Sequence, residues 1–417
     1  MTIVRPFKGY RPPEDIAEDL ACLPYDVMNT AEAALMAEGK ACSLLHITRS
    51  EIDCDAGVDV HSDEVYDKAV ANFNLFKEKG WLIQEDEAKF YIYAQTMNGR
   101  TQYGIVGAAS VQDYLDGAIK KHELTRPEKE EDRMIHVRIN NANIEPVFLS
   151  YPALPEIDEI VNNIVVNEMP VYDFTGVEDG FGHHFWVVED PAVNARIEEL
   201  FATKVPATYV ADGHHRTAAA ALVGAEKKAA NPHHKGDEEY NFFLAVHFPD
   251  DQLEIIDYNR VVRDLNGLSE DELIARIEDD FVVEALGAKV YKPSKLHEFS
   301  MYLGGKWYKM TAKEGRYDDD DPIGVLDVTI LSDLVLDKQL GIKDLRTDKR
   351  IDFVGGIRGL EELARRVDSG EMAVAFALYA VSMQQLIDIA DSGSIMPPKT
   401  TWFEPKLRSG LVIHELE

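Results

Sequence analysis

The sequence has few cysteines, no long apolar run and no surplus of basic side chains. Its three cysteines, Cys22, Cys42 and Cys54, are odd in number and show no C-x-x-C spacing, which argues against a disulfide framework and against a zinc knuckle. A reducing cytoplasm is therefore the expected location. No stretch has the apolar length of a signal peptide or a membrane span, so we expect no membrane attachment.

Positive charge is scarce along the whole chain. Only 43 Lys and Arg stand against 75 Asp and Glu, which gives a formal net charge of −32. Nucleic acids and anionic membranes are bound through clustered Lys and Arg, so this balance argues against both kinds of partner. An anionic small substrate would need a local basic pocket. The 417 residues are enough for two or three domains, each with its own core.

The common signatures of nucleotide and hydrolase sites are missing. There is no G-x-x-x-x-G-K-[ST] and no G-x-G-x-x-G between a strand and a helix, which disfavours Walker-type and Rossmann sites. The glycine cluster at 354–359 lacks that spacing and is typical of a turn into a helix. No G-x-S-x-G elbow occurs. The paired histidines lack H-E-x-x-H spacing, so a zinc site is disfavoured.

One stretch that is present, YVADGHHRTAAAAL at residues 209–222, organises the rest of the chain. Its apolar beginning is typical of a buried strand, and Asp212 and Gly213 are turn residues. Gly213 allows backbone angles that a Cβ would forbid. Alanine is the best helix former, so a helix is predicted to begin near His214.

The start of that helix is a candidate anion site. A helix N-terminus presents unpaired N–H groups and the positive end of the dipole, and His214, His215 and Arg216 add donors at the same place. This pattern indicates a phosphate or carboxylate site. The alternative is an ordinary helix start, in which Asp212 caps the helix and the histidines bond neighbouring carbonyls.

Local patterns elsewhere indicate an α+β protein. Asn98-Gly99 separates two strand-like runs at 90–95 and 101–111, which is a strong hairpin signal. The apolar run Leu44–Thr48 is predicted to be a strand. In the second half, the capping-box patterns Ser269-x-x-Glu272 and Ser382-x-x-Gln385 predict two helix starts.

A second polar cluster, His122-Glu123-Leu124-Thr125, is followed by Asp132-Arg133 in a highly charged helical segment. One interpretation is a carboxylate base beside groups that orient it. The other is a solvated helix face with surface ion pairs, which is the more common meaning of such a charge pattern.

Two further groups of cations lie in the C-terminal half. Arg260 follows a strand and could grip an anion with two N–H groups, or it could hold a domain boundary. Lys399, Thr401 and Lys406 lie on a proline-stiffened loop that suits ligand contact. The alternative for this loop is a C-terminal strap.

These clusters together resemble a known family, and the chain is identified as a member of domain-of-unknown-function family 1015. The resemblance runs from residue 5 to residue 411, and genes of this family often adjoin those for serine biosynthesis. The motifs that carry it are Pro24-Tyr25-Asp26-Val27, His122-Glu123-x-Thr125 with Asp132-Arg133, Ala211-Asp212-Gly213-His214-His215-Arg216, and Met396-Pro397-Pro398-Lys399-x-Thr401-x-Phe403-x-Pro405-Lys406-Leu407-x-Ser409-Gly410.

A remoter resemblance covers residues 103–248, which are similar to the free-serine kinases of the ParB/sulfiredoxin-like superfamily. It implies that Glu123 is the base, next to His122, and that Asp212 helps to hold Mg²⁺ or the substrate. The groups that it implies would cradle phosphate are Gly213, His214, His215 and Arg216. Lower-ranked candidates for contacts with phosphate or substrate are Arg260, Thr125, Arg133, Lys399, Thr401 and Lys406.

The expected architecture is α+β, with three parts. An N-terminal segment at 1–100 packs on a ParB-like catalytic core at 101–260, which has an insert at about 152–204. A C-terminal α+β unit at 261–417 returns its tail loop to the cleft.

The resemblance implies a Mg²⁺-dependent kinase that phosphorylates free L-serine with ATP, ADP or pyrophosphate as donor. Two alternatives stay open. One is a nucleotide or phosphoester hydrolase on the same scaffold, and the other is a non-enzymatic sensor of a nucleotide or metabolite. Nucleic acid is not an expected partner, and the sequence does not indicate an oligomeric state.

Overall fold

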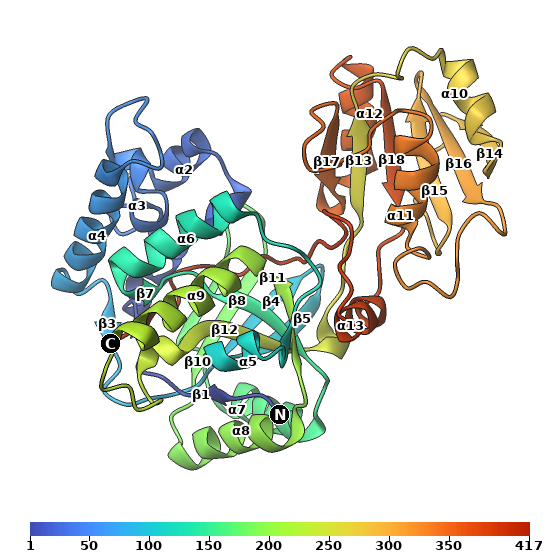
Figure 1. The fold of residues 1–417 in the computed structure, drawn as a ribbon. Coiled ribbons are helices and arrows are strands. Elements are labelled where there is room, and N and C mark those ends of the chain that lie inside the picture. The colour runs from blue at the N-terminus through green and yellow to red at the C-terminus, as the bar shows by residue number, and fades with distance from the viewer. The chain divides into compact units, whose positions relative to one another are not determined.

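The computed structural model describes all residues, 1–417, and shows helices and mixed sheets throughout. This confirms the expected α+β class. Contacts divide the chain into two units (Figure 1). Unit 1 comprises Met1–Leu253 together with Pro405–Glu417, and unit 2 comprises Glu254–Glu404. The C-terminus therefore belongs to the same unit as the N-terminus.

Unit 1 is built on a nine-stranded sheet in the order β6-β11-β8-β12-β5-β4-β10-β9, with β1 paired to β5. Most neighbours are antiparallel, but β11 is parallel to β6, and β12 is parallel to β8. The strands are β1 Val4–Arg5, β4 Tyr91–Met97, β5 Arg100–Ser110, β6 Ile119–Lys120, β8 Val147–Tyr151, β9 Tyr172–Thr175, β10 Gly182–Val187, β11 Thr208–Asp212 and β12 Phe242–Pro249.

The helices α7, α8 and α9 pack against this sheet. Short strands outside the main sheet pair as β2 (Tyr10–Arg11) with β3 (Ile83–Gln84), and as β7 (Ala142–Asn143) with β19 (His414–Glu415). The helices of unit 1 are α1 Ala17–Leu20, α2 Thr30–Ala37, α3 Leu45–Thr48, α4 Asp63–Glu78, α5 Val111–Leu115, α6 Pro127–Asn140, α7 Pro155–Asn167, α8 Pro191–Lys204 and α9 His214–Ala230.

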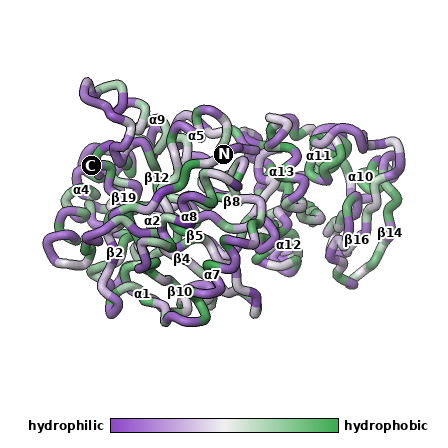
Figure 2. The backbone as a smooth tube through the Cα atoms, turned by 90° about the horizontal axis from the view of Figure 1, so that it is seen from below, coloured by the Kyte–Doolittle hydropathy of each residue, from purple (hydrophilic) through white to green (hydrophobic).

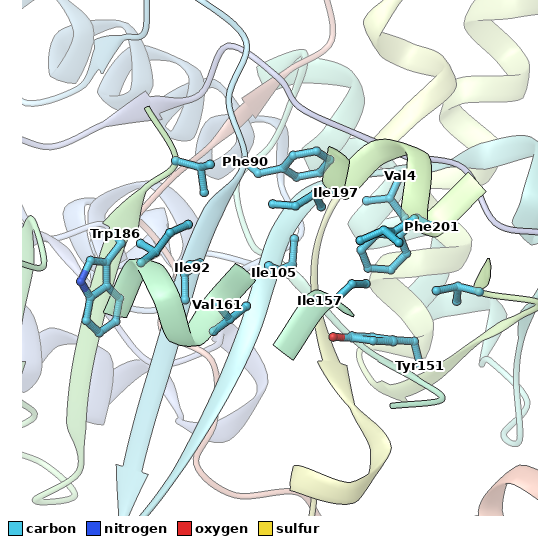
Figure 3. Close-up of a cluster of buried hydrophobic side chains, with 14 of the residues drawn as sticks. Val4, Phe90, Ile92, Ile105, Tyr151, Ile157, Val161, Trp186, Ile197 and Phe201 are labelled. Atoms are coloured by element: carbon cyan, nitrogen blue, oxygen red, sulfur yellow. The ribbon is translucent and has the colours of Figure 1, made fainter. Parts of the chain in front are cut away.

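One extensive apolar cluster lies where α7 and α8 pack on β4 and β5 (Figure 3). Ile92 and Ile105 from the strands meet Ile157, Ile197 and other helix residues there. A second cluster, farther along the same face, joins the alanines of α9 to β8, β11 and β12. The alanine-rich helix can approach the sheet closely because its side chains are small. This close packing fixes the position of its N-terminus.

The predicted hairpin is confirmed, because β4 and β5 pair directly across Asn98 and Gly99. Both residues have positive φ, 53° and 76°, as a tight hairpin turn requires. The predicted strand at Leu44–Thr48 is wrong, because these residues form helix α3. A short apolar run that is buried on several sides has no periodicity that distinguishes a strand from a helix. The segment at 152–204 is integrated in unit 1, since its strand β10 pairs with β4.

Unit 2 has an antiparallel six-stranded sheet in the order β14-β16-β15-β18-β13-β17 (Figure 1). Both predicted capping boxes are present, at Ser269 and Ser382. The elements are β13 Tyr258–Val262, α10 Glu270–Ile277, β14 Phe281–Gly287, β15 Glu298–Leu303, β16 Lys306–Ala312, α11 Asp327–Leu331, β17 Ile351–Gly355, α12 Gly359–Asp368, β18 Val374–Leu378 and α13 Met383–Asp391.

Hydrophobic and hydrophilic residues alternate in short stretches along the backbone (Figure 2). None of the helices has the length and apolar character that a membrane crossing would require.

Candidate functional site

The junction between β11 and α9 has the predicted strand–turn–helix form. The strand ends at Asp212 with an irregularity in its pairing to β8, and the helix begins at His214. Gly213 lies between them with φ 92°, a conformation that favours glycine. A Cβ on Gly213 would also lie 3.1 Å from the Arg216 guanidinium. No side chain caps the helix, so the alternative in which Asp212 is the cap is not realised.

Asp212 is the charged centre of this junction. Its Oδ2 lies 3.5 Å from Arg216 Nη2 and 3.5 Å from Lys406 Nζ in the C-terminal tail. Burial alone would raise the pKa of Asp212, but Lys406 and Arg216 outweigh it and hold that pKa at about 2. The carboxylate is therefore ionised at neutral pH. It forms ion pairs with two cations at the start of α9.

Arg216 is held in place by the backbone just before strand β8. Its Nη1 donates to the Pro146 carbonyl at 2.6 Å, and the side chain is buried. The guanidinium has five N–H groups, of which this bond and the ion pair with Asp212 use only part. Arg216 therefore presents a fixed positive charge directly beside the helix N-terminus.

The predicted base, Glu123, lies next to the same helix start. Its Oε2 is 3.9 Å from His214 Nδ1, and the His122 ring packs edge-on against the His214 ring at 4.6 Å between centroids. Burial lowers the pKa of His122 to about 4, against the opposing charge of Asp212. Burial likewise lowers the pKa of His214 well below its usual value. Both imidazoles are therefore neutral at pH 7, and they supply donors and acceptors rather than positive charge.

The loop that carries Glu123 is tied to the helix on its other side. His215 Nε2 accepts a hydrogen bond from the Arg126 backbone N–H at 3.0 Å. Thr125 Oγ1 donates to Glu130 Oε2 at 2.7 Å, which fixes the loop to the first turns of α6. The structure thus brings together Glu123, His122 and the residues of the β11–α9 junction, as the sequence analysis expected. Thr125 serves as an anchor of this loop.

Arg133 lies in a separate buried group. Its guanidinium binds Asp132 at 2.6 Å and Glu145 at 3.4 Å, and it stacks 3.7 Å above the Tyr25 ring. Burial raises the pKa of Glu145, which also accepts from the Tyr25 backbone N–H at 3.0 Å. A cavity of about 40 Å³ is lined by Arg133, Glu145 and Arg216 among others. The buried group therefore lies next to Arg216, on the interior side of the candidate anion site.

Sequence reasoning missed Glu145, which lies two residues before strand β8. It also missed the role of Tyr25, which belongs to the Pro24–Val27 motif but was given no function. Neither residue carries a local signal of its partner. Their contacts with Arg133 form only when α6 and the N-terminal segment meet.

Arg260, Lys399 and Thr401 belong to unit 2. Arg260 is fully buried, donates to the Tyr258 carbonyl, and donates from Nη2 to the Lys399 carbonyl at 2.9 Å. No carboxylate acts on its charge, and burial lowers its pKa to about 10. Lys399 has positive φ, 60°, and its Nζ lies 5.6 Å from the centre of the Tyr258 ring.

The tail places one predicted residue in unit 1. Lys406 reaches Asp212, and its own carbonyl accepts from Gln95 Nε2 at 2.9 Å. Sequence reasoning missed the neighbouring Arg408, which is buried and donates to Glu178 at 3.0 Å and Asp179 at 2.9 Å. A tail motif rich in cations could have pointed to Arg408, but its acidic partners could not have been identified from spacing.

No group of three His, Cys, Asp or Glu side chains is arranged to hold a metal ion. Asp212 is the one carboxylate at the junction itself, and its Oδ2 faces two cations. The protein therefore supplies at most one or two oxygen ligands to Mg²⁺ here. This fits the usual Mg²⁺ of phosphoryl-transfer sites, most of whose ligands are phosphates and water.

Comparison with known proteins places the chain in a family. The sequence profile described as "Protein of unknown function (DUF1015)" matches residues 4–329, more than three quarters of the chain. The chain belongs to this family. The motif at 396–410 that supplies Lys406 lies beyond the matched range. No curated protein matches the chain.

Several solved structures are similar at low identity. A mutant of free serine kinase in complex with AMP is 12% identical and has a TM-score of 0.36. The match covers 74% of this chain and 92% of the kinase chain. SbnI with C-terminal truncation from Staphylococcus aureus is 10% identical, covers 73% and 87%, and also scores 0.36. A conserved hypothetical protein from Pyrococcus furiosus is 14% identical, covers 74% and 95%, and scores 0.32. Likeness at this level carries no argument about the activity of this chain.

Proposed function

We propose that the protein is a small-molecule phosphotransferase, in the first instance a free L-serine kinase that uses ATP, ADP or pyrophosphate. The observation that carries the proposal is the meeting of three distant segments at one helix start. Glu123 comes from the loop before α6, Asp212 and Arg216 flank the β11–α9 turn, and Lys406 comes from the tail. Serine as acceptor rests on the sequence resemblance to free-serine kinases.

The helix start supplies the donor site. Phosphoryl transfer needs positioning and neutralisation of the charge on the moving group more than covalent chemistry from the protein. The first N–H groups of α9 and the positive end of its dipole favour an anion, and no side chain caps them. Gly213 lets the backbone approach the phosphates closely, while Arg216 and Lys406 add positive charge from two sides.

Glu123 is the proposed general base. Its carboxylate takes the proton of the serine hydroxyl while the hydroxyl oxygen attacks the terminal phosphorus. The bond from that phosphorus to the bridging oxygen breaks, and the shortened donor leaves with its negative charge near Lys406 and Arg216. The neutral His122 and His214 pack beside Glu123 and limit the water around it. Mg²⁺, held by the donor phosphates and Asp212, would supply further neutralisation of the transferred group.

The first test is incubation with L-serine, Mg²⁺ and each donor in turn, read for phosphoserine by mass spectrometry. We expect one donor to give phosphoserine. In Glu123→Gln, kcat should fall by about 10²- to 10⁴-fold, the usual contribution of a general base, while donor affinity is retained. Glu128→Gln is the matched control, because Glu128 is an exposed carboxylate five residues away on the same segment.

Other outcomes would redirect the assignment. Donor hydrolysis that does not need serine would indicate a nucleotide or phosphoester hydrolase. Donor binding without turnover would indicate a sensor. Full activity in Glu123→Gln would show that the base is another residue.

A further inference from the structure

Buried ion pairs of Arg408 with Glu178 and Asp179 hold the C-terminal tail in place within unit 1, and we call this set of contacts the grip. Arg408 Nη2 donates to Glu178 Oε2 at 3.0 Å and to Asp179 Oδ2 at 2.9 Å. Only 3% of the Arg408 side chain is exposed. Both acidic residues lie in the turn between β9 and β10. Charge-assisted hydrogen bonds of this kind are strong and directional, so they fix the guanidinium in one orientation.

The turn has room for this guanidinium because Gly176 has no side chain. A Cβ at that position would lie 2.3 Å from Arg408 Nη2. The turn is closed by its own backbone hydrogen bonds, from Gly176 N to the Phe181 carbonyl and from Gly180 N to the Gly176 carbonyl, both at 2.8 Å. The acidic pair is thus presented by a preformed loop.

A buried histidine and tyrosine complete the grip. Arg408 Nε lies 3.3 Å from His183 Nε2, and because a guanidinium nitrogen can only donate, this histidine nitrogen accepts. His183 Nδ1 then carries the proton and donates to Tyr93 Oη at 2.7 Å. The same Tyr93 oxygen accepts from the Arg408 backbone N–H at 3.2 Å. Burial and the charge of Arg408 lower the pKa of His183 to about 3, which keeps the ring neutral.

Lys406 lies two residues before Arg408 and has contacts of its own with unit 1. Its carbonyl accepts from Gln95 Nε2 at 2.9 Å, and its Nζ lies 3.5 Å from Asp212 Oδ2. The backbone between these two anchors is too short to move independently of them. The orientation of Arg408 therefore determines the position of the Lys406 Cα, from which the side chain extends to Asp212.

We propose that Arg408, gripped by Glu178 and Asp179, is a positioning residue that sets Lys406 against Asp212 at the phosphate site. The contribution of Lys406 to donor binding rests on the proposed function. The proposal gives the segment 152–204 a role, because its β9–β10 turn supplies the grip while its helices α7 and α8 pack on the sheet.

The positioning itself is tested by amide hydrogen exchange of the full chain. In a variant with Glu178→Gln and Asp179→Asn, we expect exchange in residues 406–409 to accelerate by about 10-fold or more, because opening of the tail becomes easier. The amide of Ile413, bonded to the Tyr10 carbonyl at 2.9 Å, should be unaffected. Unchanged exchange in 406–409 would overturn the proposal.

Two further variants test whether this result depends on the contacts of Arg408. Asp173→Asn is the matched control, because Asp173 lies on the same hairpin but pairs with His184 at 2.9 Å. It should leave exchange in the tail unchanged. Gly176→Ala removes the space for the guanidinium without changing any charge, and it should reproduce the accelerated exchange.

The link to the phosphate site is tested by a double-mutant cycle on pyrophosphate affinity, measured by calorimetry. Loss of the grip should weaken binding by about 5- to 20-fold in the wild-type background and have no further effect in Lys406→Met, because coupled residues are not additive. Equal losses in both backgrounds would contradict action through Lys406. If the wild-type chain binds neither pyrophosphate nor nucleotide, the proposed function fails, and the exchange result still decides whether Arg408 positions the tail.

Discussion

Lys406 Nζ lies 3.5 Å from Asp212 Oδ2, although 194 residues separate them in the chain. The same carboxylate oxygen lies 3.5 Å from Arg216 Nη2. Asp212 therefore shares its charge between a cation of helix α9 and a cation from the tail. Two cations face this one carboxylate, so these three side chains together carry a surplus of positive charge, in a protein whose formal net charge is −32. An anion can be attracted locally although the molecule as a whole repels it.

The first prediction concerns Lys406. In Lys406→Met, pyrophosphate affinity should fall by about 10- to 100-fold, because a hydrogen bond from a charged group contributes on the order of 1.5–3 kcal/mol. Arg216 still neutralises Asp212 in this variant, so the fold should be retained. Calorimetric titration with pyrophosphate measures the effect. Lys406→Arg, which keeps the charge, should retain most of the affinity, and equal affinity in all three proteins would remove Lys406 from the donor site.

The second prediction concerns Arg260 of unit 2, a buried cation without a carboxylate. Replacing an uncompensated buried charge by an apolar side chain of similar volume is often neutral or stabilising. Arg260→Met should therefore be at least as stable as the wild type without ligand. If Arg260 binds phosphate, as the sequence analysis predicts, the increase in Tm caused by pyrophosphate should be smaller in the variant.

Arg350→Met is the matched control for unit 2. Arg350 binds Asp348 at 2.9 Å and the Leu340 carbonyl at 3.0 Å, so its loss should lower stability and leave the ligand-induced shift unchanged. A large loss of stability in Arg260→Met, with an unaltered ligand shift, would make Arg260 a purely structural anchor of the Lys399 loop.

Features with a local cause could be predicted from the sequence. The Asn98-Gly99 hairpin, the capping boxes at Ser269 and Ser382, and the start of α9 at His214 all depend on residues within a few positions of each other. The resemblance to free-serine kinases implied that His122 and Glu123 share a site with the β11–α9 junction, and the structure places them side by side.

Features that depend on distant partners could not be predicted. Arg408 and Glu178 are 230 residues apart, and nothing in either segment marks the other as its partner. Leu45–Thr48 forms a helix because surrounding segments bury it on several sides. Four residues are too few to show a periodicity that would distinguish this helix from a strand. Arg133 was a candidate ligand contact, but its charge is taken up by Asp132 and Glu145, and Glu145 was not identified.

The third prediction concerns the loss of stability in mild acid. Burial lowers the pKa of His122 and His247 to about 4, and that of His136 and His183 to about 3. Between the unfolded pKa near 6.5 and these values, the unfolded chain binds protons that the folded chain does not. The free energy of unfolding should therefore fall as the pH decreases from about 6.5 to about 4.

His247 is a suitable reporter of this effect, because it lies away from the candidate site, is fully buried, and packs edge-on against Phe201. Its Nδ1 lies 3.2 Å from the Ile105 carbonyl, and its Nε2 has no hydrogen-bond partner. His247→Phe removes one titrating group, so the variant should lose about 2 kcal/mol less than the wild type between pH 7 and pH 5. Urea unfolding at both pH values measures this difference. An equally steep loss in both proteins would mean that His247 is protonated in the folded state at pH 5.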